Sequence, residues 1–313
     1  MPRKSKKKLK PYGPTGLLSF QRRFPDEQSC WSYLINNRWP KGIECRKCHS
    51  KKLYLISKRK LYECADCGAQ TSPTAGTILH RSHLPLRKWF WAIFLMSTSK
   101  KGVPAAYLQQ HLEIGSYRAA WLMCHKIRLA MSQREQTYGQ FDGTVQVDQI
   151  FIGGKQSAID RSVNGSNKSA FLIAVKEGPG SKPALLSFEP LGEKPDQDVV
   201  PAINKRIAKG SLIKGDAANI YAQLPGLGYQ IRVIPQRKKK FAEVHLKWVN
   251  TLTSNLKRYL LSTHHGISPK YRHTYLNEFA YRFNRRQWPA EAFDRLLFAC
   301  ANAQPKTLPE LKA

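Results

Sequence analysis

Acidic residues are scarce in this chain of 313 residues, which has 21 Asp and Glu side chains against 52 Lys and Arg. The formal charge at pH 7 is therefore 52 − 21 = +31. An excess of this size excludes a surface on which opposite charges balance. It predicts a polyanionic partner, most simply nucleic acid, although a protein at an anionic membrane surface can also be basic.

Long apolar runs are also lacking. The most apolar stretch, residues 89–96, is well short of the roughly 18 residues that a membrane-spanning helix needs. The N-terminus is basic, but no apolar segment follows it, which argues against a secretory signal peptide. We therefore expect a cytoplasmic protein without a membrane span.

Cysteine is present, but its pattern does not suit a disulfide framework. Cys45 and Cys48 form one C-x-x-C pair, and Cys64 and Cys67 form a second pair after fifteen intervening residues. This spacing is typical of two knuckles that close on one tetrahedral Zn²⁺, with a short hairpin between them, and a redox role is the alternative. The metal would supply folding energy that so small a module cannot obtain from its core. Three further cysteines are interpreted as packed thiols: Cys30, Cys124 and Cys300.

The pattern predicts five segments along the chain. Residues 1–19 form a basic arm whose first ten residues could lie along phosphates, or serve only as a solubilising tail. Residues 20–84 form the zinc-ribbon module, and residues 85–135 form a helical segment with breaks near Gly102 and Gly115. Residues 140–303 form a large α/β domain, and residues 304–313 form a tail.

The helical segment is a candidate DNA-binding element. Helices are expected from residue 85, over 103–112 and over 117–131, with Ser116 as the N-cap of the last helix. A Gly-containing turn before the last helix makes a helix-turn-helix plausible, and Arg118, Lys126 and Arg128 would then face DNA. A helical hairpin that supports the next domain is nearly as consistent with the pattern.

A carboxylate interrupts an otherwise apolar strand at residues 144–155, where Gln146 and Asp148 share one face. Two further strands, a helix over residues 196–209 and a fourth strand that ends at Asp216 follow it. The order β-β-β-α-β-α-β-α predicts a mixed RNase-H-like sheet in which the first and fourth strands are adjacent. Asp148 and Asp216 would then meet, and two carboxylates so close would repel each other unless a divalent cation lay between them, as in metal-dependent phosphoryl transfer.

A third ligand should come from a later helix, expected over residues 241–261. Glu243, Asn250 and Lys257 recur there every seven residues and therefore lie along one side of the helix. The Asn250 amide oxygen could take the third ligand position, and Lys257 could contact a phosphate. A solvated polar face is the alternative. Further DNA contacts are expected at two basic clusters: Arg237, Lys238, Lys239 and Lys240, and then Arg282, Arg285 and Arg286.

The two C-x-x-C pairs, VQVDQIFIGGK, GDAANIYAQL and HHGISPKYRHTYLNEFAYRFNRR together resemble bacterial insertion-sequence transposases of the family numbered fifteen ninety-five. Members join an N-terminal zinc ribbon to a DDE-type catalytic domain, and the resemblance covers about residues 20–301. It implies an RNase-H-like fold and Mg²⁺- or Mn²⁺-dependent cutting and joining of double-stranded DNA at terminal inverted repeats. It also implies a nucleoid-associated bacterial protein, at least dimeric on DNA.

The resemblance assigns the two catalytic acids to Asp148 and Asp216, the third position to Asn250 and the associated basic residue to Lys257. This sequence departs from the common VEVDE strand of the family by carrying Gln146 and Gln149 in place of the flanking acids. Two alternatives from other classes follow. The chain could be a DNA-binding protein that retains the fold without catalysis, or a zinc-ribbon nuclease without strand transfer.

Overall fold

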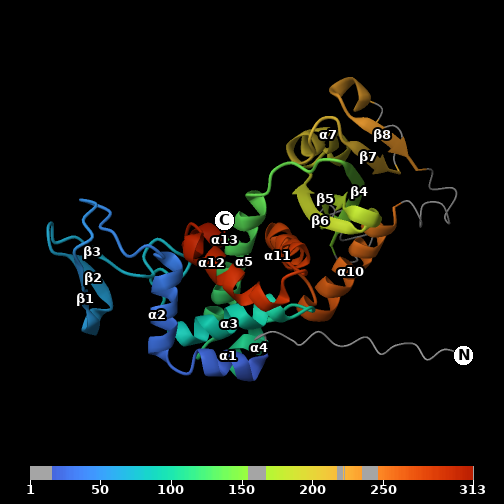
Figure 1. Cartoon of the computed structure of the whole chain (residues 1–313). Helices are drawn as coiled ribbons and strands as arrows, with labels where there is room; N and C mark the ends of the chain where they lie inside the picture. The colour runs from blue at the N-terminus through green and yellow to red at the C-terminus, as the bar shows by residue number, and fades with distance from the viewer. Residues whose placement is uncertain (1–15, 154–166, 217–220, 222, 235–245, 313) are drawn as a thin grey trace, which may run out of the picture. The chain divides into compact units, whose positions relative to one another are not determined.

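The protein is described by a computed structural model over residues 16–153, 167–216, 221, 223–234 and 246–312. The chain divides into two compact units (Figure 1). The first, the helical unit, contains Met1–Ser99, Ala105–Ala130 and Gln287–Ala313, and the second, the sheet unit, contains Lys100–Pro104 and Met131–Arg286. None of the described helices is both long and apolar enough to cross a membrane.

The sheet unit is built on five strands: β4 (Thr144–Ile152), β5 (Ser169–Glu177), β6 (Pro183–Pro190), β7 (Leu212–Gly215) and β8 (Gln230–Val233). Their order across the sheet is β6-β5-β4-β7-β8. The first three strands pair antiparallel, whereas β7 runs parallel to β4 and β8 runs parallel to β7. The predicted RNase-H-like mixed sheet is therefore confirmed, with the first and fourth strands adjacent.

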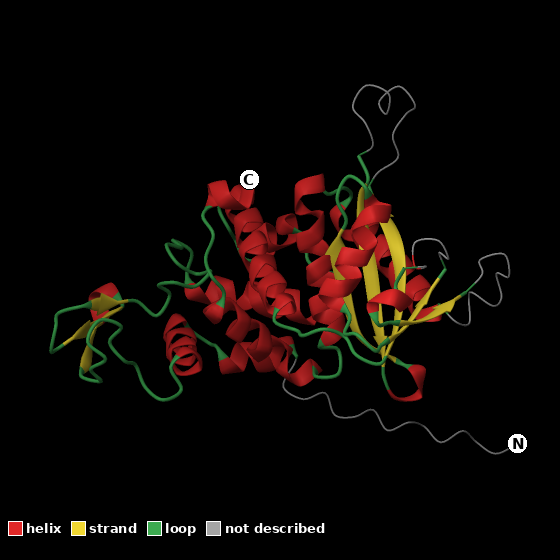
Figure 2. Cartoon of the chain, turned by 90° about the horizontal axis from the view of Figure 1, so that it is seen from above, coloured by secondary structure: helices red, strands yellow, loops and turns green. Residues whose placement is uncertain are grey.

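Helices cover both faces of the sheet (Figure 2). The odd positions of β4, such as Val145 and Val147, pack in one core with α7 (Pro195–Arg206). The even positions Ile150 and Ile152 pack in the other core with α10 (Lys247–His264) and α11 (Arg272–Asn284). Because strand side chains alternate between faces, Gln146 and Asp148 lie on the same side as α10.

Two helix boundaries in the sheet unit differ from the sequence prediction. The helix expected over residues 196–209 ends at Arg206, because Ile207 is extended and bridges to Phe141. The helix expected from residue 241 is described from Lys247, and residues 235–245, with Glu243 among them, lie outside the described residues. Local periodicity does not predict a pairing between residues 66 positions apart, such as the bridge between Phe141 and Ile207.

A buried polar cluster ties α5 (Tyr117–Gln136) and α11 to the edge strand β6. The Asn284 amide accepts from Leu186 N at 2.8 Å and donates to Leu186 O at 3.0 Å, so it completes the backbone bonds of the strand. It also donates to Glu135 at 2.6 Å, and Arg285 pairs with the same carboxylate. Burial raises the pKa of Glu135, whereas the Arg285 charge acts in the opposite direction.

The Arg285→Met substitution should lower the free energy of unfolding by about 3–5 kcal/mol, because it leaves the Glu135 carboxylate buried without its cation. Both side chains of this pair are 9% exposed. The midpoint of urea unfolding measures the change. Asp142→Asn is the matched control, because Asp142 pairs with Lys176 but is 76% exposed, and it should change stability by less than about 1 kcal/mol. Equal effects of the two substitutions would contradict the assignment.

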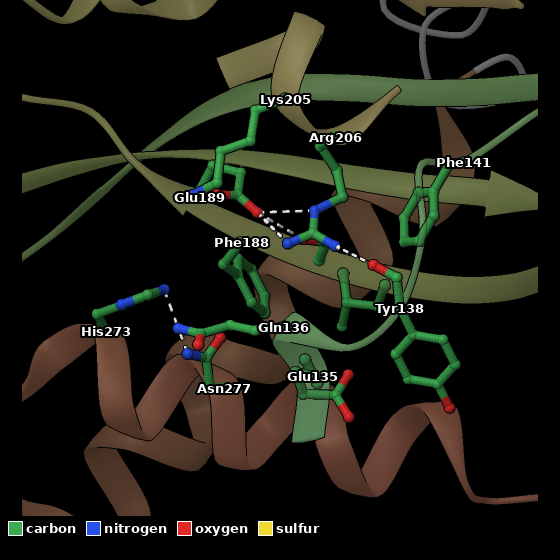
Figure 3. A pocket seen from close by; sticks show the side chains of 13 residues that line it. Glu135, Gln136, Tyr138, Phe141, Phe188, Glu189, Lys205, Arg206, His273 and Asn277 are labelled. Atoms are coloured by element: carbon green, nitrogen blue, oxygen red, sulfur yellow. Dashed lines mark hydrogen bonds and ion pairs between the residues drawn. The ribbon is translucent and has the colours of Figure 1, made fainter. Parts of the chain in front are cut away.

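A second polar cluster joins α7 to β6 (Figure 3). Glu189 accepts from Arg206 Nε at 2.7 Å and pairs with Lys205 at 2.8 Å. Burial alone would raise the pKa of Glu189, but the two cations lower it overall. Beside this cluster, burial lowers the pKa of His273, whose Nε2 lies 3.2 Å from the Asn277 amide nitrogen. With its charge neutralised by two cations, the Glu189 carboxylate serves to hold α7 against β6.

The helical unit contains α1 (Leu17–Arg23), α2 (Glu27–Arg38), α3 (Leu86–Thr98), α4 (Ala105–His111), the first part of α5, α12 (Ala292–Asn302) and α13 (Leu308–Lys312). Asp26 caps α2 through Ser29, and an aromatic core joins α1, α3 and α12 through contacts of Phe20 with Phe94 and Phe293. The predicted α/β domain over residues 140–303 thus includes α12, which packs instead in the helical unit.

Candidate functional site

Strands β4 and β7 bring Asp148 and Asp216 to the same level of the sheet. The parallel register pairs Gln146 with Lys214, and each acid follows its member of this pair by two residues in the chain. Asp216 comes directly after the end of β7, so its side chain is at the carboxyl edge of the sheet. This register agrees with the prediction that the first and fourth strands are adjacent and bring the two carboxylates near each other.

The electrostatics of the site reflect this proximity. Burial and the neighbouring charge of Asp216 raise the pKa of Asp148 to about 7, although the Gln149 backbone N–H and the Lys257 charge act to lower it. The Gln149 N–H donates to Asp148 Oδ1 at 2.8 Å. Burial, followed by the charges of Asp148 and Asp216, also raises the pKa of Tyr221. The two carboxylates therefore act electrostatically on the Tyr221 phenol, which is buried in the core on the α7 side of the sheet.

Tyr221 also explains the glycine that precedes Asp216. A Cβ added to Gly215 would lie 2.4 Å from Cε2 of the Tyr221 ring, so only glycine admits the ring against the end of β7. The Tyr221 side chain is 1% exposed. Sequence reasoning missed this residue, and its signal was available as a Tyr five residues after an acid at the end of a buried strand.

Helix α10 carries the other two predicted catalytic residues. Asn250 and Lys257 are both exposed, and they lie seven residues apart on one side of the helix. The Lys257 charge acts against the net rise in the pKa of Asp148, so its ammonium group favours the ionised form of that carboxylate. Asn250 lies in the first turn and donates its backbone N–H to Leu246 O at 3.1 Å.

The two glutamines that flank Asp148 each contact a carboxylate. Gln146 is 2% exposed, and its Nε2 donates to Glu177 at 2.7 Å, while Gln149 Nε2 donates to Asp196 at 3.2 Å. Glu177 also binds Lys214 Nζ, at 3.0 Å from each oxygen. In the sequence these glutamines indicate only missing acids, and no local pattern marks Glu177 or Lys214 as their partners.

The donor set fits a divalent cation of the Mg²⁺ type. Carboxylate and amide oxygens are the ligands that Mg²⁺ and Mn²⁺ prefer. A carboxyl with its pKa near 7 beside a second acid indicates repulsion that a cation would relieve. Asp148, Asp216 and Asn250 are the residues that could hold such an ion, with Lys257 beside them.

The ribbon in the helical unit presents a separate sulfur site. Strand β1 (Leu53–Ile56) pairs with β2 (Leu61–Cys64), and β2 pairs with β3 (Gln70–Thr71), which confirms the predicted hairpin. Two matching turns close the knuckles, because His49 N donates to Cys45 O and Gly68 N donates to Cys64 O, each at 2.9 Å.

The four ribbon thiols converge as a zinc site requires. Their Sγ atoms lie within 4.8 Å of one another, with 3.6 Å between Cys45 and Cys67 and 3.5 Å between Cys48 and Cys64. A tetrahedron with Zn–S bonds of about 2.3 Å has sulfurs about 3.8 Å apart. The backbone N–H groups of Cys48 and Lys47 lower the pKa of Cys45 to about 6, whereas hydrogen bonds with the neighbouring thiols raise the pKa of Cys48, so the metal-free cluster favours a thiolate at Cys45. The predicted structural Zn²⁺ therefore fits these four cysteines.

The three predicted packed thiols, Cys30, Cys124 and Cys300, are each fully buried, as expected.

The predicted DNA contacts on α5 divide into two kinds. Ser116 caps this helix by accepting from Ala119 N at 3.2 Å, and Arg118 is exposed in the first turn. Lys126 is half-buried and donates to His80 O at 3.4 Å. The prediction for Arg128 needs correction: its side chain is 1% exposed, so it is part of the core and cannot reach a phosphate.

The three arginines near the end of α11 differ as predicted DNA contacts, and it is buried Arg285 that needs correction. Arg282 donates to Lys100 O at 2.9 Å and lies over the Tyr259 ring. Arg285 is buried against Glu135, and Arg286 donates to Phe283 O at 2.7 Å and to β6 carbonyls. The buried Arg285 stabilises the sheet unit, a role that a basic cluster in sequence does not reveal. Half-buried Arg282 and exposed Arg286 stay predicted DNA contacts. The run from Arg237 through Lys238 and Lys239 to Lys240 lies outside the described residues.

Two family models match this chain. Residues 25–70 match a transposase zinc-ribbon domain, and residues 140–284 match the ISXO2-like transposase domain of IS1595 elements. The chain carries both domains of an IS1595-type transposase. The first match contains the four ribbon cysteines, and the second contains Asp148, Asp216, Asn250 and Lys257.

A more distant relative of this chain comes from a named mobile element. It is described as an uncharacterized protein in transposable element ISH50 of Halobacterium salinarum and is 21% identical over 134 residues. The match covers 42% of this chain and 44% of the relative, so the chain spans under half the length of that protein.

Proposed function

We propose that this chain is a DNA transposase that binds the terminal inverted repeats of an insertion sequence and catalyses metal-dependent DNA cleavage and strand transfer. The observation that carries the proposal is the pairing of Asp148 with Asp216 at the carboxyl edge of the sheet, where burial and mutual repulsion raise the pKa of Asp148 to about 7. A phosphoryl-transfer site of the DDE type needs such a pair to hold divalent cations.

Each residue has a defined task. Asp148 and Asp216 would hold and orient a divalent cation, and the Asn250 amide oxygen would complete the ligand set. Lys257 lies near the carboxylates and contacts a phosphate of the strand that is cut. Bound Mg²⁺ or Mn²⁺ would supply a Lewis acid and a water of lowered pKa. The same residues then hold the freed 3′-hydroxyl beside target DNA, so positioning and charge neutralisation are the contribution of the protein.

DNA carrying the element's ends tests the proposal directly. Purified protein with Mg²⁺ should release a 3′-hydroxyl at the repeat and join it to a second duplex. Cleavage without any joined product would favour a zinc-ribbon nuclease instead. Tight binding to the ends with no cleavage in Mg²⁺ or Mn²⁺ would favour a DNA-binding protein that has lost catalysis, an alternative motivated by the neutral Asn250 in the third position.

Recognition of the ends is assigned to the ribbon and the helices α3 to α5, with Arg118 as an exposed cation in the first turn of α5. Because transposition joins two ends, at least a dimer is expected on DNA, in the cytoplasm and associated with the nucleoid. Within the helices α4 and α5, the Ser116-capped turn is consistent with a helix-turn-helix.

Deleting residues 1–10 should weaken DNA binding about equally for repeat and unrelated sequences, because a basic arm contacts phosphates without reading bases. The slope of log affinity against log salt should become shallower by about 0.9 for each phosphate that the arm neutralises in the full-length protein. Fluorescence anisotropy at several salt concentrations measures both quantities. A selective loss for the repeat sequence would show that the arm reads bases, and an unchanged salt slope would show that it is only a solubilising tail.

A further inference from the structure

Helix α10 begins without a cap from its own sequence. Its N-cap residue is Leu246, which has no side-chain group that accepts a hydrogen bond, and no such bond is present. The first backbone N–H groups of a helix have no partner within the helix and need an acceptor from elsewhere. This helix carries Asn250 in its first turn, so the position of that turn decides where the Asn250 amide lies.

Gln146 supplies the missing acceptor from β4. Its Oε1 accepts from Trp248 N at 3.1 Å and from Val249 N at 3.2 Å, about a hundred residues away in sequence. Its Nε2 donates to Glu177 Oε1 at 2.7 Å. Two backbone donors on one side and a carboxylate on the other fix the orientation of the amide, because only the oxygen can face the helix.

Glu177 is itself held in place. Lys214 Nζ lies 3.0 Å from both Glu177 oxygens, and the Glu177 and Lys214 side chains are 8% and 14% exposed. Gln146 and Lys214 are register partners on β4 and β7. The bonds therefore run from β7 through β5 and β4 to the first turn of α10, among buried groups where an unsatisfied donor or acceptor is costly.

We propose that Gln146 is a positioning residue that fixes the first turn of α10, and with it Asn250, relative to Asp148, and that its amide is required because Glu177 faces it. Both Gln146 and Asp148 belong to β4, two residues apart on the same face. If the contact between Gln146 and the first turn of α10 shifts, Asn250 moves relative to Asp148. The role assigned to Asn250 rests on the proposed function, whereas the anchoring of α10 does not.

The Glu177 carboxylate explains why position 146 requires an amide and not a second carboxylate. A glutamate side chain at position 146 could still accept from the helix, but it would place a second carboxylate against Glu177, and one of the two would have to bind a proton. Exchanging the two residues, as in the double variant Gln146→Glu with Glu177→Gln, restores one carboxylate and one amide. The new amide at position 177 could then donate to the new carboxylate at position 146, while the amide oxygen accepts from Lys214.

Hydrogen exchange at the start of α10 tests the anchor without any catalysis. Amide protection at Trp248 and Val249 should fall at least tenfold in Gln146→Glu at pH 8 and return to within about threefold of wild type in the double variant. Gln230→Glu on β8 is the matched control, since Gln230 is exposed and the charge change is the same; protection at α10 should not change. Unchanged protection in Gln146→Glu, or no recovery in the double variant, would overturn the proposal.

Cleavage of end-containing DNA then tests the consequence for the site. Gln146→Glu should cut at least tenfold more slowly at pH 8 and regain most of its rate in the double variant. DNA affinity should not change. If wild-type protein does not cut DNA but protection follows the expected pattern, the proposed function fails and the anchor stands. If protection follows the pattern while the cleavage rates of all variants equal wild type, the link from Gln146 to the site is wrong.

Discussion

Asp148→Asn should abolish DNA cleavage and, in the absence of metal, make the folded protein more stable at pH 8. The rate should fall at least roughly 10³-fold, because the substitution removes a carboxylate from a site whose metal accounts for several kcal/mol of transition-state stabilisation. The shape of the side chain is retained, and the Asn oxygen can still accept from Gln149 N, as Asp148 Oδ1 does at 2.8 Å.

The expected gain in stability follows from the sign of the pKa shift. Burial and Asp216 raise the pKa of Asp148 from 3.8 to about 7 in the folded protein. Between these values the folded state binds more protons than the unfolded state, so wild-type stability falls as pH rises through this window. Asn at this position does not ionise, and the advantage of the variant should therefore grow from pH 4 to pH 8.

Melting temperatures of the metal-free proteins at pH 4 and pH 8 measure this effect, at about 2–4 °C for each kcal/mol of repulsion removed. Wild type should gain more from added Mg²⁺ or Mn²⁺ than the variant does. Asp198→Asn is a control with the same chemical change, because Asp198 accepts from Gly192 N at 2.7 Å outside the candidate site, and cleavage should persist in it. An inactive variant that is also less stable at pH 8 would point to misfolding, and cleavage that survives in Asp148→Ala and Asp216→Ala would refute the site.

The sheet and the acid pair were predictable because they depend on patterns that are local in sequence. Alternation in β4, the apolar run of β5 and an acid at the end of β7 indicate the strands, and topology then places Asp148 near Asp216. The ribbon was predictable for a similar reason, since ligand spacing reports the knuckle geometry directly.

The remaining features depend on contacts between residues that are distant in sequence. Arg285 is indistinguishable from a DNA-binding arginine until the fold places it beside Glu135, 150 residues earlier. Gln146 reads as the loss of an acid until α10 is placed against β4 and its oxygen meets two backbone donors. Net charge predicts the polyanion partner, but it does not say which cations remain at the surface, and buried Arg128 shows the difference.

Loss of zinc should have the other large effect, confined to the ribbon and to DNA binding. Cys64→Ser should remove the single Zn²⁺ and unfold residues 44–71, because structural zinc contributes roughly 10–16 kcal/mol and a module this small has little other core. The Cys64 side chain is 1% exposed and is the last residue of β2, so one substitution removes both a ligand and the end of the hairpin. Zinc content per chain and limited proteolysis measure the two losses.

His49→Ala provides the matched control, because His49 follows Cys48 but pairs with Glu44 at 3.0 Å and is not one of the four thiols. It should retain one zinc per chain and a protease-resistant ribbon. In Cys64→Ser, affinity for terminal repeats should fall at least tenfold, while the sheet unit retains its unfolding transition, because its core clusters contain no ribbon residue. If the Cys64→Ser variant lacks zinc and its ribbon is cleaved by protease, yet it binds terminal repeats with full affinity, the ribbon does not recognise the ends. That role would then belong to α3, α4 and α5.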